Sequence, residues 1–387
     1  MTATVARTNR RLRFDWSADV GVPALIRAAG MAVQLAVLAW VNGPHGPSLV
    51  DRLTKWDGRF YIGIAESGYP DVTLAGPTGE LTRGGEYAFY PLYSGLVAVV
   101  HAVLRLPTDV AALTVSALAG MTAACGVHLV TVELTGSRRT GYLAAALLSV
   151  LPMAVTFQMA YAEALYTALA VFAVLFSLRG SWWLAGAMAF AAGLTRPTGL
   201  LVALVIPVAA LWLSRRREAR VSWASVAGAT VVALAASPLF WLALWWRTGD
   251  AARWFRAERR GWDTRVDLGH QTWTFVHSTL AHPDSFLGPA VCLILAGYVA
   301  ALIIVGLGRW PAPILAAALL PALLVLGTTN YWHSKPRLLL AAFILVVPAA
   351  AGLAKLRTGT ALVLLALGTL ASAWFGAYML CIWPFAI

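Results

Sequence analysis

Apolar runs of about 17 to 25 residues recur along the chain, separated by short polar segments that carry most of the charge. Helices of this length cross the hydrocarbon core of a bilayer, and the runs lack the alternation of a membrane β-strand. The pattern therefore predicts an all-α polytopic membrane protein. The predicted spans are approximately 22–41, 88–106, 110–133, 140–158, 160–178, 181–194, 198–213, 222–246, 286–307, 311–327, 338–354 and 360–384.

The remaining segments complete one predicted domain, 1–387. They are a tail at 1–21 and two long polar loops at 42–87 and 247–285. Cytoplasmic loops are enriched in Arg and Lys, so the strongest basic cluster, 215–220, predicts that 247–285 and 328–337 lie outside. The arginines at 7, 10, 11 and 13 predict that the tail is retained in the cytoplasm, and 42–87 is then the first outer loop.

The charges conflict with the span count at one place. If 88–106 crosses the membrane completely, loop 42–87 lies on the same side as Arg138 and Arg139, opposite to the side given by the basic tail. Either a segment between Ala88 and Glu133 is re-entrant, or one basic cluster breaks the rule. We give more weight to the charges and leave 11 or 12 spans open.

Composition supports a membrane protein. The chain is 60% hydrophobic and 12% charged, whereas about a quarter of the residues of a soluble domain are charged. The net charge of +12 is a topology signal, and nucleic-acid binding is not expected. Cys125, Cys292 and Cys381 lie in apolar runs and predict core thiols. A richness in Ala and Arg with little Lys indicates a GC-rich bacterial genome.

The segment 55–69 places an acid, two bases and several aromatics just outside the first span. Asp57 can cap a short amphipathic helix that ends at Gly68 and lies flat at the membrane interface. A chain this apolar has few acidic side chains, so the cluster is a candidate active site with Asp57 as its acid. The alternative is that Asp57 is only a helix cap and the helix only an anchor.

Aromatic residues mark the entry to the next span. Pro91 suits the first turn of a helix, and Tyr90 and Tyr93 suit a membrane interface. Aromatic faces also stack on sugar rings, although a simple interfacial belt is the alternative interpretation. The candidate substrate-binding residues are Trp56, Arg59, Tyr90, Tyr161, Glu163 and His333.

Glu163 and Arg196 are ionisable residues at predicted membrane depth. Glu163 is expected about one turn inside an apolar helix, where a carboxylate needs a partner or water; a purely structural pair with a buried Arg is the alternative. Arg196 separates two spans of only about 14 to 16 residues, so it should lie sunk in a cavity. A guanidinium there suits a bidentate grip on phosphate.

The segment 328–337 brings His333, Lys335 and Arg337 to the predicted outer side. With Arg196, Lys335 and Arg337 form a candidate anion site for a lipid phosphate, although both side chains could instead snorkel at a helix end. Loop 247–285 contains a basic stretch with two tryptophans and predicts an interfacial helix. The weak metal signal that follows it comes from Asp263, Asp267, His270 and His277.

These motifs, in this order, resemble the PIG-V family of integral membrane mannosyltransferases, which includes GPI mannosyltransferase II. The match is specific in the first half of the chain and weaker after about residue 215. After the acid, Gly58 and Arg59 differ from the eukaryotic pattern, and Tyr90 replaces a Phe. The matching parts are the Trp56–Asp57 helix ending at Gly68–Tyr69, Phe89–Tyr90–Pro91, Tyr161 to Leu165 and Thr195 to Gly199, with a general Pro336–Arg337–Leu338–Leu339 ending.

The resemblance implies a GT-C fold, a polyprenyl-phosphate sugar donor, and an inverting transfer that uses no nucleotide sugar, no cofactor and usually no metal. It implies that Asp57 is the acid of the first outer loop, that Arg196 contacts donor phosphate, and that Glu163 is a second polar contact. A bacterial, actinobacterial-type member has no GPI precursor to act on, so the acceptor does not follow from the family.

The leading hypothesis is therefore mannose transfer from polyprenyl-phosphate-mannose to a glycolipid or lipid-linked acceptor. The reaction would take place on the outer face of the bacterial plasma membrane, with Asp57 as general base and Arg196, Lys335 and Arg337 stabilising the departing phosphate. One alternative within the fold is another polyprenyl-phosphate sugar or a protein acceptor. An alternative from another class is a transporter or flippase of lipid-linked sugars.

Overall fold

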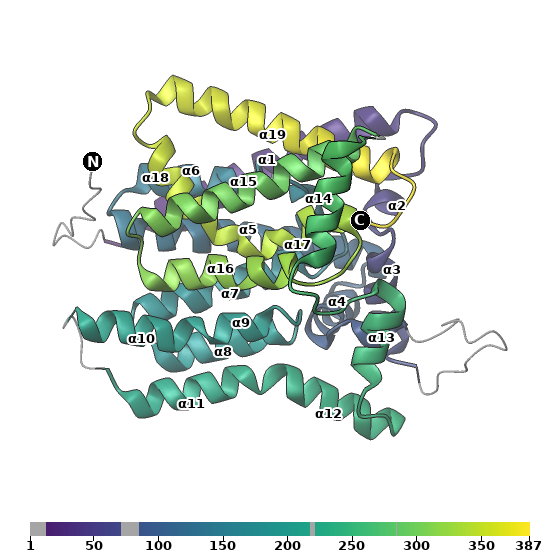
Figure 1. Ribbon diagram of the computed structural model, residues 1–387, viewed down its shortest axis with the longest axis horizontal. Coiled ribbons are helices and arrows are strands. Elements are labelled where there is room, and N and C mark those ends of the chain that lie inside the picture. The colour runs from purple at the N-terminus through teal and green to yellow at the C-terminus, as the bar shows by residue number, and fades with distance from the viewer. Residues whose placement is uncertain (1–12, 71–84, 217–220, 284) are drawn as a thin grey trace.

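The computed structural model describes residues 13–70, 85–216, 221–283 and 285–387, and Figure 1 shows them as a bundle of helices that run roughly side by side. Within these residues the regular elements are helices, and one isolated bridge pairs Val266 with Thr328. The arginines at 7, 10 and 11, on which the prediction of a cytoplasmic tail rests, lie outside the described residues, as do most of the residues of 71–87.

The first half of the chain forms the helices α1 (Val22–Asn42), α2 (Leu49–Leu53), α3 (Asp57–Ser67), α4 (Pro91–Leu104), α5 (Thr108–Thr135), α6 (Arg138–Leu147), α7 (Glu163–Leu178) and α8 (Trp182–Gly193). The second half forms α9 (Gly199–Ala203), α10 (Val205–Arg215), α11 (Trp223–Leu234), α12 (Ala236–Thr248), α13 (Arg253–Trp262), α14 (His270–Ala281), α15 (Leu287–Leu307), α16 (Ala312–Leu326), α17 (Lys335–Leu338), α18 (Val346–Leu353) and α19 (Thr358–Cys381). A π-helical turn, Ser17–Gly21, precedes α1, and 3₁₀ turns lie at Gly85–Ala88, Ala154–Phe157, Trp332–Ser334 and Leu339–Leu345.

Six helical segments of the described chain are long and apolar enough to cross a membrane, and five shorter apolar helices accompany them. The predicted all-α polytopic membrane protein is thus confirmed. One predicted span, 140–158, is wrong as a continuous helix. The chain leaves α6 at Leu147, passes Pro152, adopts a left-handed conformation at Met153 and forms only a 3₁₀ turn. Hydropathy does not register such a proline break, because the run is apolar throughout.

The first span has the dimensions of a bilayer. At 1.5 Å per residue, the 21 residues of α1 extend about 31 Å, close to the thickness of the hydrocarbon core. Trp16 lies before this helix and Trp40 near its end, and both are largely exposed. Exposed Trp at the two ends of a span is typical of the aromatic belts at membrane interfaces.

Small residues allow the central helices to approach closely. A Cβ atom added at Gly126 of α5 would lie 2.3 Å from Val171 of α7, and one added at Gly186 of α8 would lie 2.9 Å from the carbonyl oxygen of Ala229 in α11. Membrane helices gain their packing energy from such contacts, because lipid tails are as apolar as the side chains. The tightly packed helices give the candidate site a rigid floor.

The two ends of the bundle carry different groups. At one end, which we call the basic end, Arg138 pairs with Asp19 of the N-terminal turn, and Arg139 donates to the carbonyl oxygens of Ala354 and Leu356. Loop 42–70, α13 and α14 lie at the opposite end in Figure 1. We call this the cavity end.

This arrangement resolves the conflict between the charges and the span count. The chain leaves α3 at the cavity end and reaches Arg138 at the basic end, so α4 and α5 together make one net crossing. The 28-residue helix α5, about 42 Å long, makes that crossing. Helix α4 has only 14 residues, and the Tyr93 hydroxyl of its first turn donates to the carbonyl oxygen of Ala112 near the start of α5. Of the two alternatives given by the sequence, the structure therefore favours the one in which a segment between Ala88 and Glu133, here α4, does not cross completely.

Candidate active site

A cavity of about 740 Å³ opens at the cavity end, within the range of about 300 to 1,000 Å³ usual for ligand sites. It lies between α3, the start of α4, the start of α7, the 195–198 turn, α13 and the segment 324–338. Its ionisable lining residues are Asp57, Tyr61, Tyr90, Glu163, Arg196, Arg256, Glu258, Arg259, Arg265, Tyr331 and Arg337. Five of the ten candidate residues are among them: Asp57, Tyr90, Glu163, Arg196 and Arg337.

Asp57 is the first residue of α3 and is 9% exposed. The prediction that its carboxylate caps this helix is wrong, because Trp56 occupies the capping position and no side chain caps the helix. Trp56 has a positive φ of 53°, a backbone conformation that costs a bulky residue roughly 1–3 kcal/mol. The turn leaves the Asp57 carboxylate free to face the cavity. Gly68 ends the helix, as predicted.

Arg337 holds that carboxylate. Its Nη1 lies 2.5 Å from Asp57 Oδ2, and the guanidinium is 6% exposed and lies over the ring of Tyr161 at 5.1 Å. Its Nε has no hydrogen-bond partner among the described residues and lies 3.8 Å from Glu163 Oε1. Tyr161 does not line the cavity; its hydroxyl donates to the Lys55 carbonyl oxygen at 3.3 Å. Tyr161 thus supports Arg337 from behind.

A second ion pair lies beside the first. Arg196 Nη1 is 2.6 Å from Glu163 Oε1, and Glu163 is the first residue of α7, so it stands at the edge of the cavity. Tight packing fixes the Arg196 turn: a Cβ at Gly199 would lie 2.3 Å from the backbone nitrogen of Gly193. Glu163 therefore has an arginine partner, and that partner, Arg196, is half-buried and itself lines the cavity.

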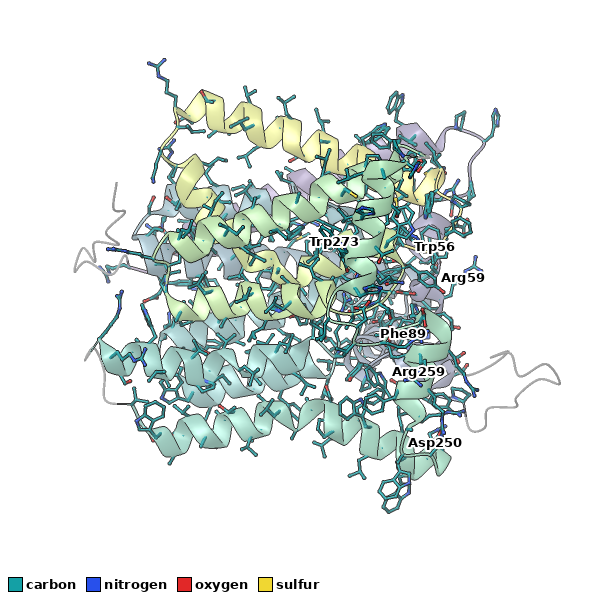
Figure 2. All side chains as sticks on the ribbon, viewed as in Figure 1. Trp56, Arg59, Phe89, Asp250, Arg259 and Trp273 are labelled. Atoms are coloured by element: carbon teal, nitrogen blue, oxygen red, sulfur yellow. The ribbon has the colours of Figure 1, made fainter. Side chains whose placement is uncertain are left out.

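The two pairs together carry no net charge, whereas the described residues at the mouth of the cavity carry a net positive charge. Arg256 pairs with Asp250 and Arg265 with Asp263, but Arg259 makes no ion pair with any described residue. In Figure 2, Arg259 of α13 and Phe89 lie near each other, and both line the cavity. An unpaired guanidinium at the mouth of a partly apolar cavity attracts anions.

Five of the candidate residues do not line the cavity. Arg59 is exposed on the outer face of α3, and Trp56 lies beneath Lys55, whose ammonium is 4.7 Å from the centre of the indole. His333 packs against Tyr331, Trp332 and Trp383, and Tyr161 lies behind Arg337 as described. Figure 2 shows Trp56 and Arg59 at the edge of the cavity end.

Lys335 is the fifth of these residues. It is 0% exposed, and its Nζ donates to the carbonyl oxygens of Val325 and Thr328 at 2.9 and 2.8 Å. The ammonium thus satisfies orphan carbonyls at the end of α16. This position contradicts the predicted contact of Lys335 with a donor phosphate.

Sequence reasoning did not identify Glu258 as a site residue. It lies on α13, the predicted basic interfacial helix, and lines the cavity. Burial raises the pKa of Glu258 to about 7. The sequence feature that could have identified Glu258 is its spacing from Trp254 and Trp262, because residues four apart lie on the same face of a helix.

The residues of the weak metal signal have other roles. Asp263 pairs with Arg265, and the carboxylate of Asp267 accepts hydrogen bonds from the backbone nitrogens of Gly269 and Gln271 at the start of α14. In the part of the chain that the structure describes, no three His, Cys, Asp or Glu residues gather as a metal site would require. Cys125 and Cys292 are buried free thiols, as predicted, and Cys381 is half-buried.

Comparison with solved structures shows that this chain has the fold of the GT-C membrane glycosyltransferases. It is similar to ArnT from Cupriavidus metallidurans bound to undecaprenyl phosphate, with a TM-score of 0.52 and 15% identity over 94% of this chain and 76% of that one. It is also similar to the oligosaccharyltransferase AglB from Archaeoglobus fulgidus in complex with an inhibitory peptide and a dolichol-phosphate. There the TM-score is 0.51 and the identity 13%, over 95% of this chain and 56% of that one.

The chain thus spans just over half the length of the oligosaccharyltransferase. No family model and no curated protein matches the sequence. At identities this low the similarity shows the fold, and the predicted GT-C fold is confirmed. The resemblance to the PIG-V mannosyltransferases stays a prediction.

Proposed function

We propose that this protein is a glycosyltransferase that moves mannose from polyprenyl-phosphate-mannose to a glycolipid or lipid-linked acceptor. The observation that carries the proposal is the cavity itself, which combines a buried acid, two guanidiniums held by ion pairs and, at its mouth, the Arg259 guanidinium, which pairs with no described residue. This set of groups suits a reaction in which a hydroxyl loses a proton while a phosphate departs.

The solved neighbours support a polyprenyl-phosphate donor. The ArnT structure holds undecaprenyl phosphate, and the AglB complex holds dolichol-phosphate. The choice of mannose, of a PIG-V relationship and of the outer face of a bacterial plasma membrane rests on the sequence motifs and the charge pattern. Because the basic end carries Arg13, Arg138 and Arg139, we assign it to the cytoplasm and the cavity to the outer face.

Each residue of the proposed mechanism has one task. Asp57 accepts the proton of the acceptor hydroxyl as its oxygen attacks the anomeric carbon from the side opposite the phosphate, and the bond between that carbon and the phosphate oxygen breaks with inversion. Arg337 orients the Asp57 carboxylate. Arg259 and Arg196 stabilise the negative charge that develops on the polyprenyl phosphate. In this division of labour, guanidiniums supply the charge that a divalent ion supplies elsewhere.

The test is transfer of radiolabelled mannose by the purified protein in nanodiscs. We expect Asp57→Asn to lower turnover by at least about 100-fold, the usual contribution of a positioned base. Glu66→Gln, on the exposed side of the same helix, is the matched control and should retain wild-type turnover. Near-normal turnover of the Asp57→Asn protein would remove Asp57 from the mechanism. Movement of the lipid-linked sugar across sealed vesicles without a new glycosidic bond would instead identify a flippase.

A further inference from the structure

Helix α13 presents one face to the cavity. Trp254, Glu258 and Trp262 follow one another at intervals of four residues, which places them on the same side of a helix, and all three line the cavity. Arg260, between them in sequence, is exposed and does not line it. The face therefore consists of a carboxyl group between two indole rings.

Aromatic packing anchors this face. Trp254 Nε1 donates to the carbonyl oxygen of Ala88 at 3.2 Å, and Trp262 lies edge-to-face with Phe89 and Phe60 at centroid distances of 5.3 and 5.9 Å. These contacts fix the helix to the turn that precedes α4 and to α3. Its position over the cavity is therefore defined by the same elements that hold Asp57.

A hydrogen-bond chain holds one oxygen of the Glu258 carboxyl group. Thr264 Oγ1 lies 3.0 Å from Glu258 Oε2 and 2.9 Å from Asn330 Oδ1, and the Asn330 amide donates to Thr328 Oγ1. A hydroxyl has one proton, so Thr264 cannot donate to both oxygens. Either Thr264 donates to Glu258 Oε2, or a protonated Glu258 donates to Thr264 and Thr264 donates to Asn330; both arrangements engage only Oε2 of the carboxyl group.

The Glu258 carboxyl group keeps one oxygen as an acceptor for a ligand. With Oε2 used on Thr264, Oε1 makes no hydrogen bond to any described residue, and the side chain lines the cavity. The charged groups that face this cavity are Asp57, Glu163, Arg196, Arg256, Arg259, Arg265 and Arg337. No described cation lies within ion-pair distance of the Glu258 carboxyl group, so it is not committed to a structural salt bridge.

We propose that Glu258 and Trp262 form a pyranose-binding wall, in which Glu258 accepts a hydrogen bond from a ring hydroxyl and Trp262 packs against the ring. The inference rests on the proposed function and names the element that recognises its sugar. A carboxyl group between aromatic rings suits a ligand that is hydroxylated at its edges and apolar on its faces. Arg259, the next residue along α13, places a phosphate-binding group beside the ring.

Two sugars could use this wall: the mannose of the donor or a sugar of the acceptor. The experiment uses the full chain in nanodiscs with three probes: polyprenyl-phosphate-mannose, bare polyprenyl phosphate, and the acceptor at varied concentration. The variants are Glu258→Leu, which removes the carboxyl group, and Glu258→Gln, which keeps the shape and the carbonyl acceptor. Trp262→Leu tests the ring contact, and Arg260→Gln is the matched control on the opposite face of the helix.

We expect Glu258→Leu and Trp262→Leu to weaken binding of the sugar-bearing ligand about 10-fold, the effect of losing one good contact. If the donor sugar is bound, affinity for polyprenyl-phosphate-mannose falls while affinity for bare polyprenyl phosphate stays unchanged. If the acceptor sugar is bound, the acceptor KM rises and both lipid affinities stay unchanged. Glu258→Gln and Arg260→Gln should remain within about threefold of wild type.

The proposal is overturned if Glu258→Leu and Trp262→Leu leave all three quantities unchanged, or if they lower affinity for bare and mannosylated lipid equally. The proposal stays testable even if the Glu258→Leu protein fails to fold. In that case Glu258→Gln must retain binding, and Trp262→Leu must still affect the mannosylated and the bare lipid differently. Failure of the proposed function is seen separately in the wild-type protein, which would then neither transfer mannose nor prefer the mannosylated lipid.

Discussion

Removing either partner of the Asp57–Arg337 pair should destabilise the protein, and removing both should restore much of the loss. Both groups are largely buried, and Nη1 and Oδ2 are 2.5 Å apart. Loss of one partner of a buried pair costs about 3–5 kcal/mol, because it leaves an uncompensated charge. The four groups Asp57, Glu163, Arg196 and Arg337 carry no net charge, so each single substitution leaves one unit of charge in the cluster.

The structure ranks the two single variants. In Asp57→Asn, the guanidinium of Arg337 still lies 3.8 Å from Glu163. In Arg337→Gln, Asp57 loses its one ion pair among the described residues. We therefore expect Arg337→Gln to cost more. With about 2.1 cal/mol/K of unfolding entropy per residue, 3–5 kcal/mol over 387 residues lowers the Tm by roughly 4–6 °C.

The assay is thermal unfolding followed by tryptophan fluorescence in one detergent, with mannose transfer measured in parallel. The Asp57→Asn/Arg337→Gln protein, whose cluster is neutral again, should recover at least half of the lost Tm but none of the activity. Glu66→Gln and Arg59→Gln, exposed on the same helix, should shift the Tm by less than about 1 °C. Simple addition of the two single losses in the double variant would refute electrostatic coupling between the two residues.

Three further predictions concern single positions. Lys335→Met should destabilise the protein by about 1–3 kcal/mol, because two buried carbonyl oxygens lose their hydrogen-bond donor. The donor KM should stay unchanged, and a raised donor KM in a titration would show that Lys335 contacts the donor phosphate. The pKa of Glu258 is about 7 in the folded protein, against an ordinary 4.5. The stability that its protonated form contributes is therefore complete below pH 4.5 and is lost as the pH rises to about 7. Tm measured against pH should show this loss of about 3 kcal/mol in wild type, and Glu258→Gln should abolish it. Gly199→Ala should lower turnover roughly 100-fold by displacing Arg196, since the new methyl group would meet the Gly193 backbone; wild-type turnover would show that the turn can yield.

The sequence predicted the membrane class and placed several residues of the candidate cavity at one end of the bundle. Hydropathy locates apolar helices, and basic loops orient them, so Asp57, Arg196 and Arg337 were all expected near one end. The pairing of Asp57 with Arg337 could not be predicted. It joins positions 280 residues apart, and no local pattern specifies which of several arginines reaches a given acid.

Lys335 and Glu258 show two other limits. Lys335 and Arg337 are two positions apart, so a helical turn directs them about 200° from each other, and only Arg337 faces the cavity. Both residues are basic and were predicted on the same side of the membrane, so the sequence did not show that their side chains point in different directions. Glu258 stands among arginines in α13, so the basic character of the segment concealed a half-buried acid that lines the cavity. Its role becomes visible only when the neighbouring Thr264 and Asn330 are placed in space.

The distance along the chain between Asp57 and Arg337 also sets the order in which the site is made. At roughly 5–20 residues per second, synthesis of the intervening 280 residues takes about 14 to 56 s. Through that time the Asp57 carboxylate is already beyond the first span, but its counter-charge has not yet been synthesised. The ion pair of the candidate site therefore forms only after the last third of the chain has begun to emerge, and a nascent protein truncated before α17 has Asp57 without Arg337.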